Sequence, residues 1–267
     1  MKWACASLGV LLLFLFTSPF TSAAADAAGG PDWKEIKSGH FILFYEGAQS
    51  VFADTVVRSA ESFYDEIAHS LGYSRKDQFW LWEKRCRIYL YGSKEKFHQT
   101  SGQKAWSNGY ALLATRTIIS YQGSQEFLQG VLPHELAHLI LKDFVGGEST
   151  LPLWMDEGLA MAQEKQRRVE LDQIARKSIQ DKKWIPLAKL SQTHSMVAAS
   201  ADEVALFYAE SQSLVRFLLS AEKPGRFVQL CRDIRDGIVF EEALKKNYPK
   251  EFESVSELET KWVASNG

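Results

Sequence analysis

Residues 132–141 read Leu-Pro-His-Glu-Leu-Ala-His-Leu-Ile-Leu and lie within a longer run, 127–144, whose apolar residues recur with helical spacing. His134 and His138 are four residues apart, so both side chains project from one face of the predicted helix and can bind the same metal ion. Glu135 is rotated by about 100° from His134, which suits contact with a metal-bound water rather than a third ligand position.

This spacing is informative because histidine is rare in the chain, with 6 in 267 residues. A chance match is expected in roughly one such chain in a hundred, before a helical setting is required. The alternative is that His134 and His138 are two helix-surface histidines without a role. Because the residues around them are apolar, two unpaired imidazoles would be costly there, and we interpret the pair as a metal site.

Zinc suits two imidazoles, and a catalytic zinc site typically adds one further protein ligand and keeps one position for water. Glu157 follows His138 after 18 residues, within Leu-Trp-Met-Asp-Glu-Gly-Leu-Ala at 153–160. That length suits a helix end, a break at Gly146-Gly147 and an antiparallel return. We therefore predict one zinc ion per chain, bound by both histidines and Glu157.

The acids Asp156 and Glu157 also have a simpler explanation, since acids are favoured at the N-terminal end of a helix. Both explanations can hold together. The apolar flanks Trp154, Met155 and Leu159 indicate that one of the two acids points inward. Asp156 is expected either to hydrogen-bond a histidine ligand or to cap the helix.

The remaining pattern divides into a strand-rich first half and a helical second half. Strands are expected at 41–45, 87–91, 117–121 and, more briefly, 108–113, with an amphipathic helix at 52–67. Later helices are expected from about 154 and at 203–219, 226–235, 241–246 and 257–264. The last has a capping box, Ser256 with Glu259. Pro133 is expected to kink the helix at 127–144. The pattern indicates an α+β protein.

The chain has 31 Lys+Arg against 33 Asp+Glu and no long run of one sign. This charge balance does not predict nucleic-acid binding and argues against an anionic membrane surface as partner. Residues 1–25 predict a cleavable secretory signal, because Lys2 precedes an apolar run too short to span a bilayer and Ala23–Ala25 follow it. An uncleaved anchor is the alternative.

The mature protein is therefore expected to be exported, periplasmic or secreted, without stable membrane insertion. Residues 26–36 are expected to form a flexible leader and 37–267 a single domain, divided into 37–145 and 146–267. Export makes Cys86 and Cys231 candidates for a disulfide, but each lies in an apolar pattern. We favour two separate buried thiols.

The chain resembles the gluzincin metallopeptidases in its H-E-x-x-H motif, which is followed after 18 residues by Glu within Trp-Met-Asp-Glu-Gly-Leu-Ala. The likeness is closest to exported bacterial peptidase MA-like domains and more distant to M1 aminopeptidases, and extends over about residues 37–220. It implies a zincin-like fold: a small N-terminal sheet with helices, an active-site helix and a helical C-terminal subdomain. It also implies zinc-dependent hydrolysis of a peptide or protein substrate, with Glu135 as general base.

In gluzincins resembling this chain, a tyrosine from a later helix faces the zinc and steadies the tetrahedral intermediate. Tyr208 is the candidate for that role and His194 the second choice, although Tyr208 could equally be a core tyrosine. Two departures limit the likeness: Met161 stands where thermolysin-like enzymes have Asp, and the Gly-x-Met-Glu-Asn segment of the aminopeptidases is missing.

Two other functions stay open. One is a non-catalytic zincin-fold binding module of the cell envelope, and the other is a zinc hydrolase of a non-peptide amide. The presence of all three ligands together with Glu135 favours the peptidase. The oligomeric state is left open by the sequence.

Overall fold

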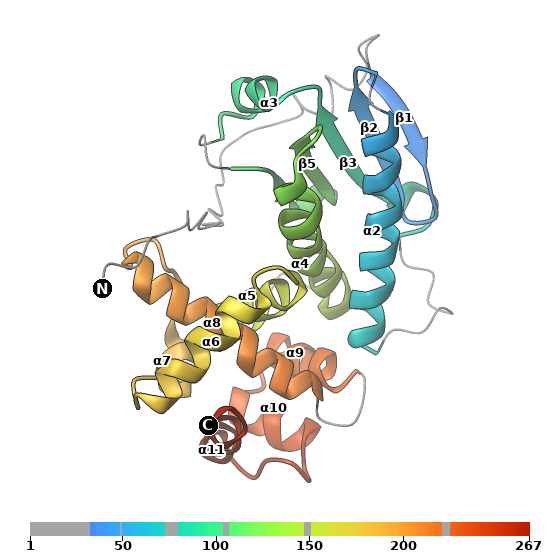
Figure 1. Cartoon of the computed structure of the whole chain (residues 1–267). Coiled ribbons are helices and arrows are strands. Elements are labelled where there is room, and N and C mark those ends of the chain that lie inside the picture. The colour runs from blue at the N-terminus through green and yellow to red at the C-terminus, as the bar shows by residue number, and fades with distance from the viewer. Residues whose placement is uncertain (1–32, 49, 73–79, 104–106, 147–150, 221–224) are drawn as a thin grey trace, which may run out of the picture. The chain divides into compact units, whose positions relative to one another are not determined.

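The computed structural model describes residues 33–48, 50–72, 80–103, 107–146, 151–220 and 225–267 (Figure 1). They form two compact units: unit 1 comprises residues up to 61 and 79–132, and unit 2 comprises 62–78 and 133–267. The export signal expected over 1–25 lies outside the described residues and stays a prediction. Among the described residues, no helix combines the length and the apolar character needed to cross a bilayer.

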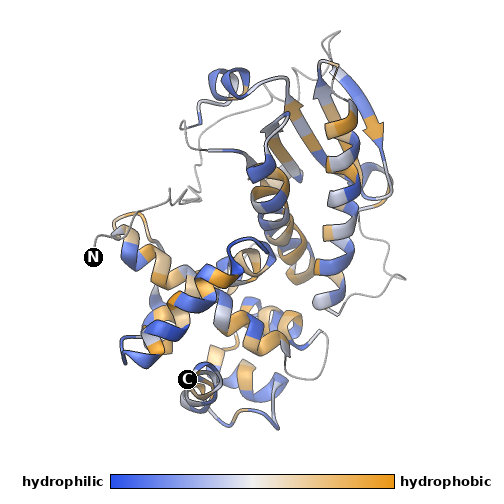
Figure 2. Ribbon diagram, in the orientation of Figure 1, coloured by the Kyte–Doolittle hydropathy of each residue, from blue (hydrophilic) through white to orange (hydrophobic). Residues whose placement is uncertain are grey.

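Unit 1 contains a five-stranded sheet in the order β1-β2-β3-β5-β4. The strands are β1 (Trp33–Lys37), β2 (Phe41–Glu46), β3 (Cys86–Tyr91), β4 (Tyr110–Leu112) and β5 (Thr117–Tyr121). The three inner strands are parallel, and β1 and β4 pair antiparallel at the two edges. Figure 2 shows apolar residues along the inner strands and a mostly hydrophilic β1. The segment expected to be a flexible leader, 26–36, therefore ends inside an edge strand.

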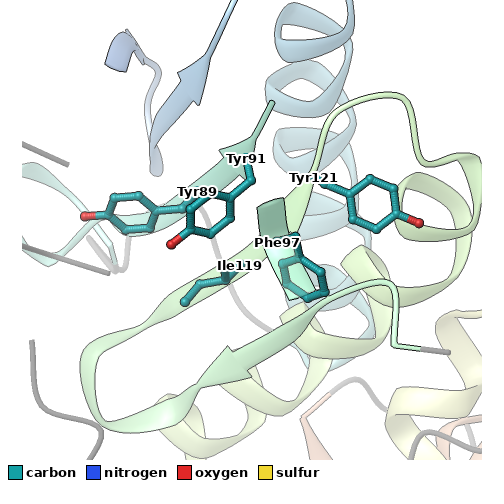
Figure 3. Close-up of a cluster of buried hydrophobic side chains, with 5 residues drawn as sticks. All are labelled: Tyr89, Tyr91, Phe97, Ile119 and Tyr121. Atoms are coloured by element: carbon teal, nitrogen blue, oxygen red, sulfur yellow. The ribbon is translucent and has the colours of Figure 1, made fainter. Parts of the chain in front are cut away.

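One face of this sheet carries a buried, mostly aromatic cluster. Its members are Tyr89, Tyr91, Phe97, Ile119 and Tyr121 (Figure 3). The parallel register of β3 and β5 places four of them on the same face. The fifth, Phe97, comes from α3 (Lys94–Ser101), a helix that the sequence did not predict. The Ser93 hydroxyl caps this helix by accepting a hydrogen bond from the backbone N–H of Lys96 at 3.2 Å.

Helix α2 (Ser50–Ser70) is anchored to the start of β2 by one carboxylate. Glu61 Oε1 accepts hydrogen bonds from the backbone N–H of His40 at 2.9 Å and from the Ser38 hydroxyl at 2.6 Å. Glu61 Oε2 lies 2.6 Å from His40 Nδ1. Burial raises the pKa of Glu61, but these contacts outweigh burial and lower it. The carboxylate is therefore ionised and ties the helix to the sheet.

The helix predicted over 127–144 forms with a change of winding rather than as one uniform helix. A π-helical turn (Phe127–Val131) leads directly into α4 (Leu132–Val145). The π turn ends two residues before Pro133, whose missing N–H disturbs a regular α-helix. Gly146, with a φ of 71°, follows α4 and ends it. The boundary between the units lies at 132/133 within this run, whereas the sequence placed a subdivision at 145/146.

Apart from α2 and α4, unit 2 contains seven further helices in its described residues. They are α5 (Leu153–Gln163), α6 (Arg168–Gln180), α7 (Leu187–Gln192), α8 (Ala201–Ser220), α9 (Arg226–Arg235), α10 (Phe240–Asn247) and α11 (Val255–Asn266). All but α6 and α7 match predicted helices to within a few residues. Helix α8 packs against both α5 and α6 (Figure 1). The expected α+β, zincin-like architecture is confirmed.

The capping box predicted for the last helix was wrong by two residues. The Ser254 hydroxyl caps α11 by accepting a hydrogen bond from the backbone N–H of Glu257 at 3.1 Å, so the cap is not Ser256. Glu259 instead accepts hydrogen bonds from Trp184 Nε1 at 2.9 Å and from the backbone N–H of Leu187 at 3.0 Å. Its carboxylate thus holds the segment that leads into α7.

Helices α5 and α8 approach each other closely at Gly158. A Cβ atom at this position would lie 2.4 Å from the backbone oxygen of Ser211 and 2.6 Å from a side-chain carbon of Val215. Only glycine therefore permits this packing. The packing joins the helix that carries Glu157 to the helix that carries Tyr208, and the charge of Glu157 acts on the Tyr208 hydroxyl.

The two cysteines of the described chain are separate thiols. Cys86 lies on β3 and Cys231 on α9; both are buried, and no disulfide joins them. Burial raises the pKa of the Cys231 thiol well above its ordinary value. A buried, protonated thiol is unreactive and behaves as a small apolar residue. The interpretation favoured from the sequence is confirmed.

Candidate metal centre

The three predicted ligands lie together in unit 2. His134 and His138 come from α4, and their Nε2 atoms are 3.1 Å apart. Glu157 comes from α5, and its Oε2 lies 3.8 Å from Nε2 of His134 and 3.9 Å from Nε2 of His138. None of the three residues is more than 3% exposed. One ligand atom from each lies within 4.8 Å of the others, which is the arrangement of a metal site.

These atoms fit a zinc ion. Tetrahedral zinc with bonds of about 2.0–2.1 Å separates its ligand atoms by roughly 3.3 Å. The histidine pair matches that separation, and Glu157 is displaced from it by about half an ångström. Oε2 of Glu157 is also buried without a hydrogen-bond partner. A buried carboxylate oxygen in that state is costly unless a cation binds it.

Two further carboxylates orient the histidines. Nδ1 of His134 lies 2.8 Å from Oε1 of Glu164, and Nδ1 of His138 lies 2.9 Å from Oδ1 of Asp156. We assign the proton to Nδ1 in both rings because only a protonated nitrogen can donate to a carboxylate. This leaves the Nε2 atoms of the two rings, 3.1 Å apart, as the atoms that can bind a metal ion.

Asp156 takes the first of the two roles expected for it. Its carboxylate holds His138, whereas α5 follows Pro152 and has no side-chain cap. Burial raises the pKa of Asp156, but the charge and hydrogen bond of His138 outweigh burial and lower it. Asp156 is therefore ionised, as a partner of a metal-binding histidine is expected to be.

Negative charge is concentrated around the ligands. Burial lowers the pKa of His138, but the carboxylates of Asp156, Glu157 and Glu135 outweigh burial and raise it to about 10. Burial also raises the pKa values of Glu135 and Glu157. A divalent cation would neutralise this charge, which is otherwise costly to bury.

Glu135, the predicted general base, lies beside the two histidines. It is 2% exposed, and the charges of His134 and His138 both act on its carboxyl group.

Tyr208 reaches the same region from α8. Its side chain is buried, and burial followed by the charge of Glu157 raises its pKa, while the charge of Arg167 opposes the rise. The hydroxyl therefore keeps its proton and can donate a hydrogen bond beside the ligands. The second choice, His194, is exposed in the segment between α7 and α8. The charges of Glu157 and Glu164 act on the Tyr208 hydroxyl, so Tyr208 stays the first candidate for the oxyanion donor.

Sequence reasoning missed Glu164. It lies at the end of α5, seven residues after Glu157, so two helical turns place both acids on one face. Burial raises the pKa of Glu164, but His134 and Arg167 outweigh burial and lower it. The seven-residue spacing was the available signal. It could not be recognised because the partner, His134, comes from another helix.

The fold and this ligand set define a zincin-like α+β protein with a peptidase-type site. Comparison with protein families gives the same class, because the sequence model of the Peptidase MA superfamily matches residues 77–265, about seven tenths of the 267. The chain therefore belongs to the Peptidase MA superfamily, as its motifs suggested. No curated protein is similar enough in sequence to count as a match.

Proposed function

We propose that this protein is an exported, zinc-dependent peptidase of the H-E-x-x-H…Glu type. The observation that carries the proposal is the buried group formed by His134, His138 and Glu157, with Glu135 beside it. Membership of the Peptidase MA superfamily supports a peptide or protein substrate. The export part of the proposal is supported by the sequence of residues 1–25 alone. A mature N-terminus near Ala25, measured by mass spectrometry after secretion, would test that part.

Each residue then has a defined task. A bound zinc ion would supply a Lewis acid that polarises the peptide carbonyl and lowers the pKa of a bound water towards about 7. Glu135 accepts a proton from the attacking water and delivers it to the leaving amine. Burial raises the pKa of the Glu135 carboxyl, and a higher pKa makes its carboxylate a stronger proton acceptor. Tyr208 donates its hydroxyl hydrogen to the developing oxyanion.

Metal analysis of the purified protein tests the ligand assignment. The wild-type protein should contain one zinc ion per chain, and His138→Ala should lose most of the metal while the chain remains folded. Circular dichroism checks that the variant is folded. Full zinc occupancy in His138→Ala would overturn the assignment.

Digestion of a peptide library with and without a chelator tests the reaction. Glu135→Gln should keep its zinc and lose at least the 10²–10⁴-fold in turnover that is typical of general-base removal, because an amide cannot accept the proton. Turnover within threefold of wild type would reject Glu135 as the base. Zinc binding without cleavage of any peptide would favour the non-catalytic binding module, and cleavage of only non-peptide amides would favour the other hydrolase.

A further inference from the structure

One cationic side chain lies at the solvent edge of the metal centre. Nη1 of Arg167 is 3.5 Å from Oε2 of Glu164, whose other carboxylate oxygen is 2.8 Å from Nδ1 of His134. The Arg167 side chain is 30% exposed, whereas that of His134 is 1% exposed. Arg167, in the turn between α5 and α6, thus places a positive charge between the buried ligands and the solvent.

Glu164 links Arg167 to Tyr208. Its carboxylate contacts Arg167 at 3.5 Å, and its charge acts on the Tyr208 hydroxyl, on which the charge of Arg167 acts as well. In the proposed reaction this hydroxyl faces the polarised carbonyl of the substrate. A substrate bound there would therefore have part of its chain near the Arg167 guanidinium.

Most N–H donors of the Arg167 guanidinium are available to a ligand. It carries five N–H donors in a planar fork, a geometry that matches a carboxylate. Within the described residues, its one side-chain contact is the 3.5 Å approach to Glu164, at the outer limit for a hydrogen bond. That contact uses little of the hydrogen-bonding capacity of a partly exposed arginine.

The acidic surroundings of the ligands leave Arg167 as the group that can attract an anionic part of a substrate. The other charged side chains beside the histidines are acids, namely Glu135, Asp156, Glu157 and Glu164. These acids would repel an anionic group of a substrate that approached them. Arg167 provides the positive charge at the solvent edge that can attract such a group.

We infer that Arg167 binds a carboxylate of the peptide substrate and so sets a preference for substrates with a negative charge close to the scissile bond. This inference rests on the proposed peptidase function and adds its substrate class. The carboxylate has two sources, a free C-terminus or an acidic side chain. Both present the same planar pair of oxygens to the arginine fork.

Matched peptides distinguish the two sources. One pair differs only in a C-terminal carboxylate or amide, and the other only in Glu or Gln next to the cleaved bond. Binding is measured by calorimetry to zinc-loaded Glu135→Gln protein, and cleavage is measured with wild-type protein. One charged peptide should bind roughly 10–100-fold more tightly than its neutral partner and be cleaved with a correspondingly higher kcat/KM. The pair that shows this difference identifies the source.

Arg167→Gln should abolish the difference within each pair while the neutral peptides keep their affinity within about threefold. Arg167→Lys should restore part of it, because lysine provides a point charge without the fork. Lys165→Gln is the matched control: it removes one charge from the same turn, but Lys165 Nζ pairs with Glu66 at 2.6 Å rather than with Glu164. This control should keep the full preference.

Several outcomes overturn the inference. They are equal binding of charged and neutral peptides to the Glu135→Gln protein, no binding of either form, and an unchanged preference in Arg167→Gln. A purely structural role for Arg167 would lower zinc content and weaken all four peptides equally, which also contradicts the inference. Charge-selective binding without cleavage by the wild-type protein would instead contradict the proposed function and leave the carboxylate site standing.

Discussion

Nδ1 of His134 lies 2.8 Å from Oε1 of Glu164, so helix α5 supplies both a metal ligand, Glu157, and the carboxylate that orients another ligand. Such partners fix the ring orientation and raise the basicity of the metal-binding nitrogen. We expect Glu164→Gln to weaken zinc binding by about 10–100-fold, because an amide accepts the hydrogen bond without the negative charge. Competition with a chelator of known affinity measures the change.

The control for this prediction is Glu170→Gln, which removes the same charge from an exposed position on α6. It should bind zinc as the wild-type protein does. If Glu164→Gln also kept wild-type affinity, the contact seen between Glu164 and His134 would have no part in metal binding.

The close approach of α5 and α8 makes Gly158 a sensitive position. In Gly158→Ala the new Cβ would lie 2.4 Å from the backbone oxygen of Ser211, so the two helices must separate. We expect a loss of about 1–3 kcal/mol in the free energy of unfolding, as for other overpacked positions. Chemical denaturation measures it.

Gly130→Ala is the matched control, since nothing beyond the adjoining backbone lies within 4 Å of a Cβ built at Gly130. It should leave stability unchanged or slightly raised, because alanine restricts the unfolded chain more than glycine. An equally stable Gly158→Ala protein would show that the helices can separate at no cost.

The metal ligands could be predicted because their geometry is local. Residues i and i+4 share a helix face whatever surrounds the helix, so His134 and His138 were paired by sequence alone. Glu157 followed from a recognisable helix start at a suitable distance. The strands β2, β3 and β5 were found because inner strands are apolar on both faces and interrupted by polar turns.

The missing elements depend on distant residues. Strand β1 (Trp33–Lys37) is a half-exposed edge strand that pairs with β2, and its short polar sequence has no strong pattern of its own. Helices α3 and α7 have 8 and 6 residues, which is too short to show a helical period. Glu164 and Arg167 resembled solvated surface charges, and only the packing of α5 beside α4 shows what they contact.

Glu210 predicts a pH dependence of stability. Burial and then the neighbouring charge of Glu259 raise its pKa to about 7, although hydrogen bonds from the Ser178 hydroxyl and the backbone N–H of Ile185 act in the opposite direction. The folded protein thus retains a proton that the unfolded chain releases near its ordinary pKa of 4.5. Stability from this group is present below pH 4.5 and is lost as the pH rises to about 7.

This difference in the pKa of Glu210 between the folded and unfolded chain corresponds to about 3 kcal/mol in the free energy of unfolding. Glu210→Gln stays neutral, and its amide can accept from Ile185 and donate to Ser178, so it should match the wild type at pH 5 and exceed it by up to that amount at pH 8. Denaturation at both pH values measures the difference. Glu242→Gln, at an exposed position on α10, should show no pH-dependent gain. A constant difference between Glu210→Gln and wild type would contradict the expected titration.

The oxyanion donor gives the last prediction, and Tyr208 is its subject. The ring of Tyr208 packs edge-on against Phe207, with centroids 5.8 Å apart, so Tyr208→Phe should keep its packing and lose only the hydroxyl. Loss of one oxyanion donor typically lowers turnover by roughly 10²–10³-fold. We expect that loss with unchanged zinc content, because the hydroxyl acts on the substrate and not on the ligands. His194→Ala provides the comparison, since its side chain is exposed and should leave turnover near wild type. Full turnover in Tyr208→Phe together with a large loss in His194→Ala would transfer the role to His194.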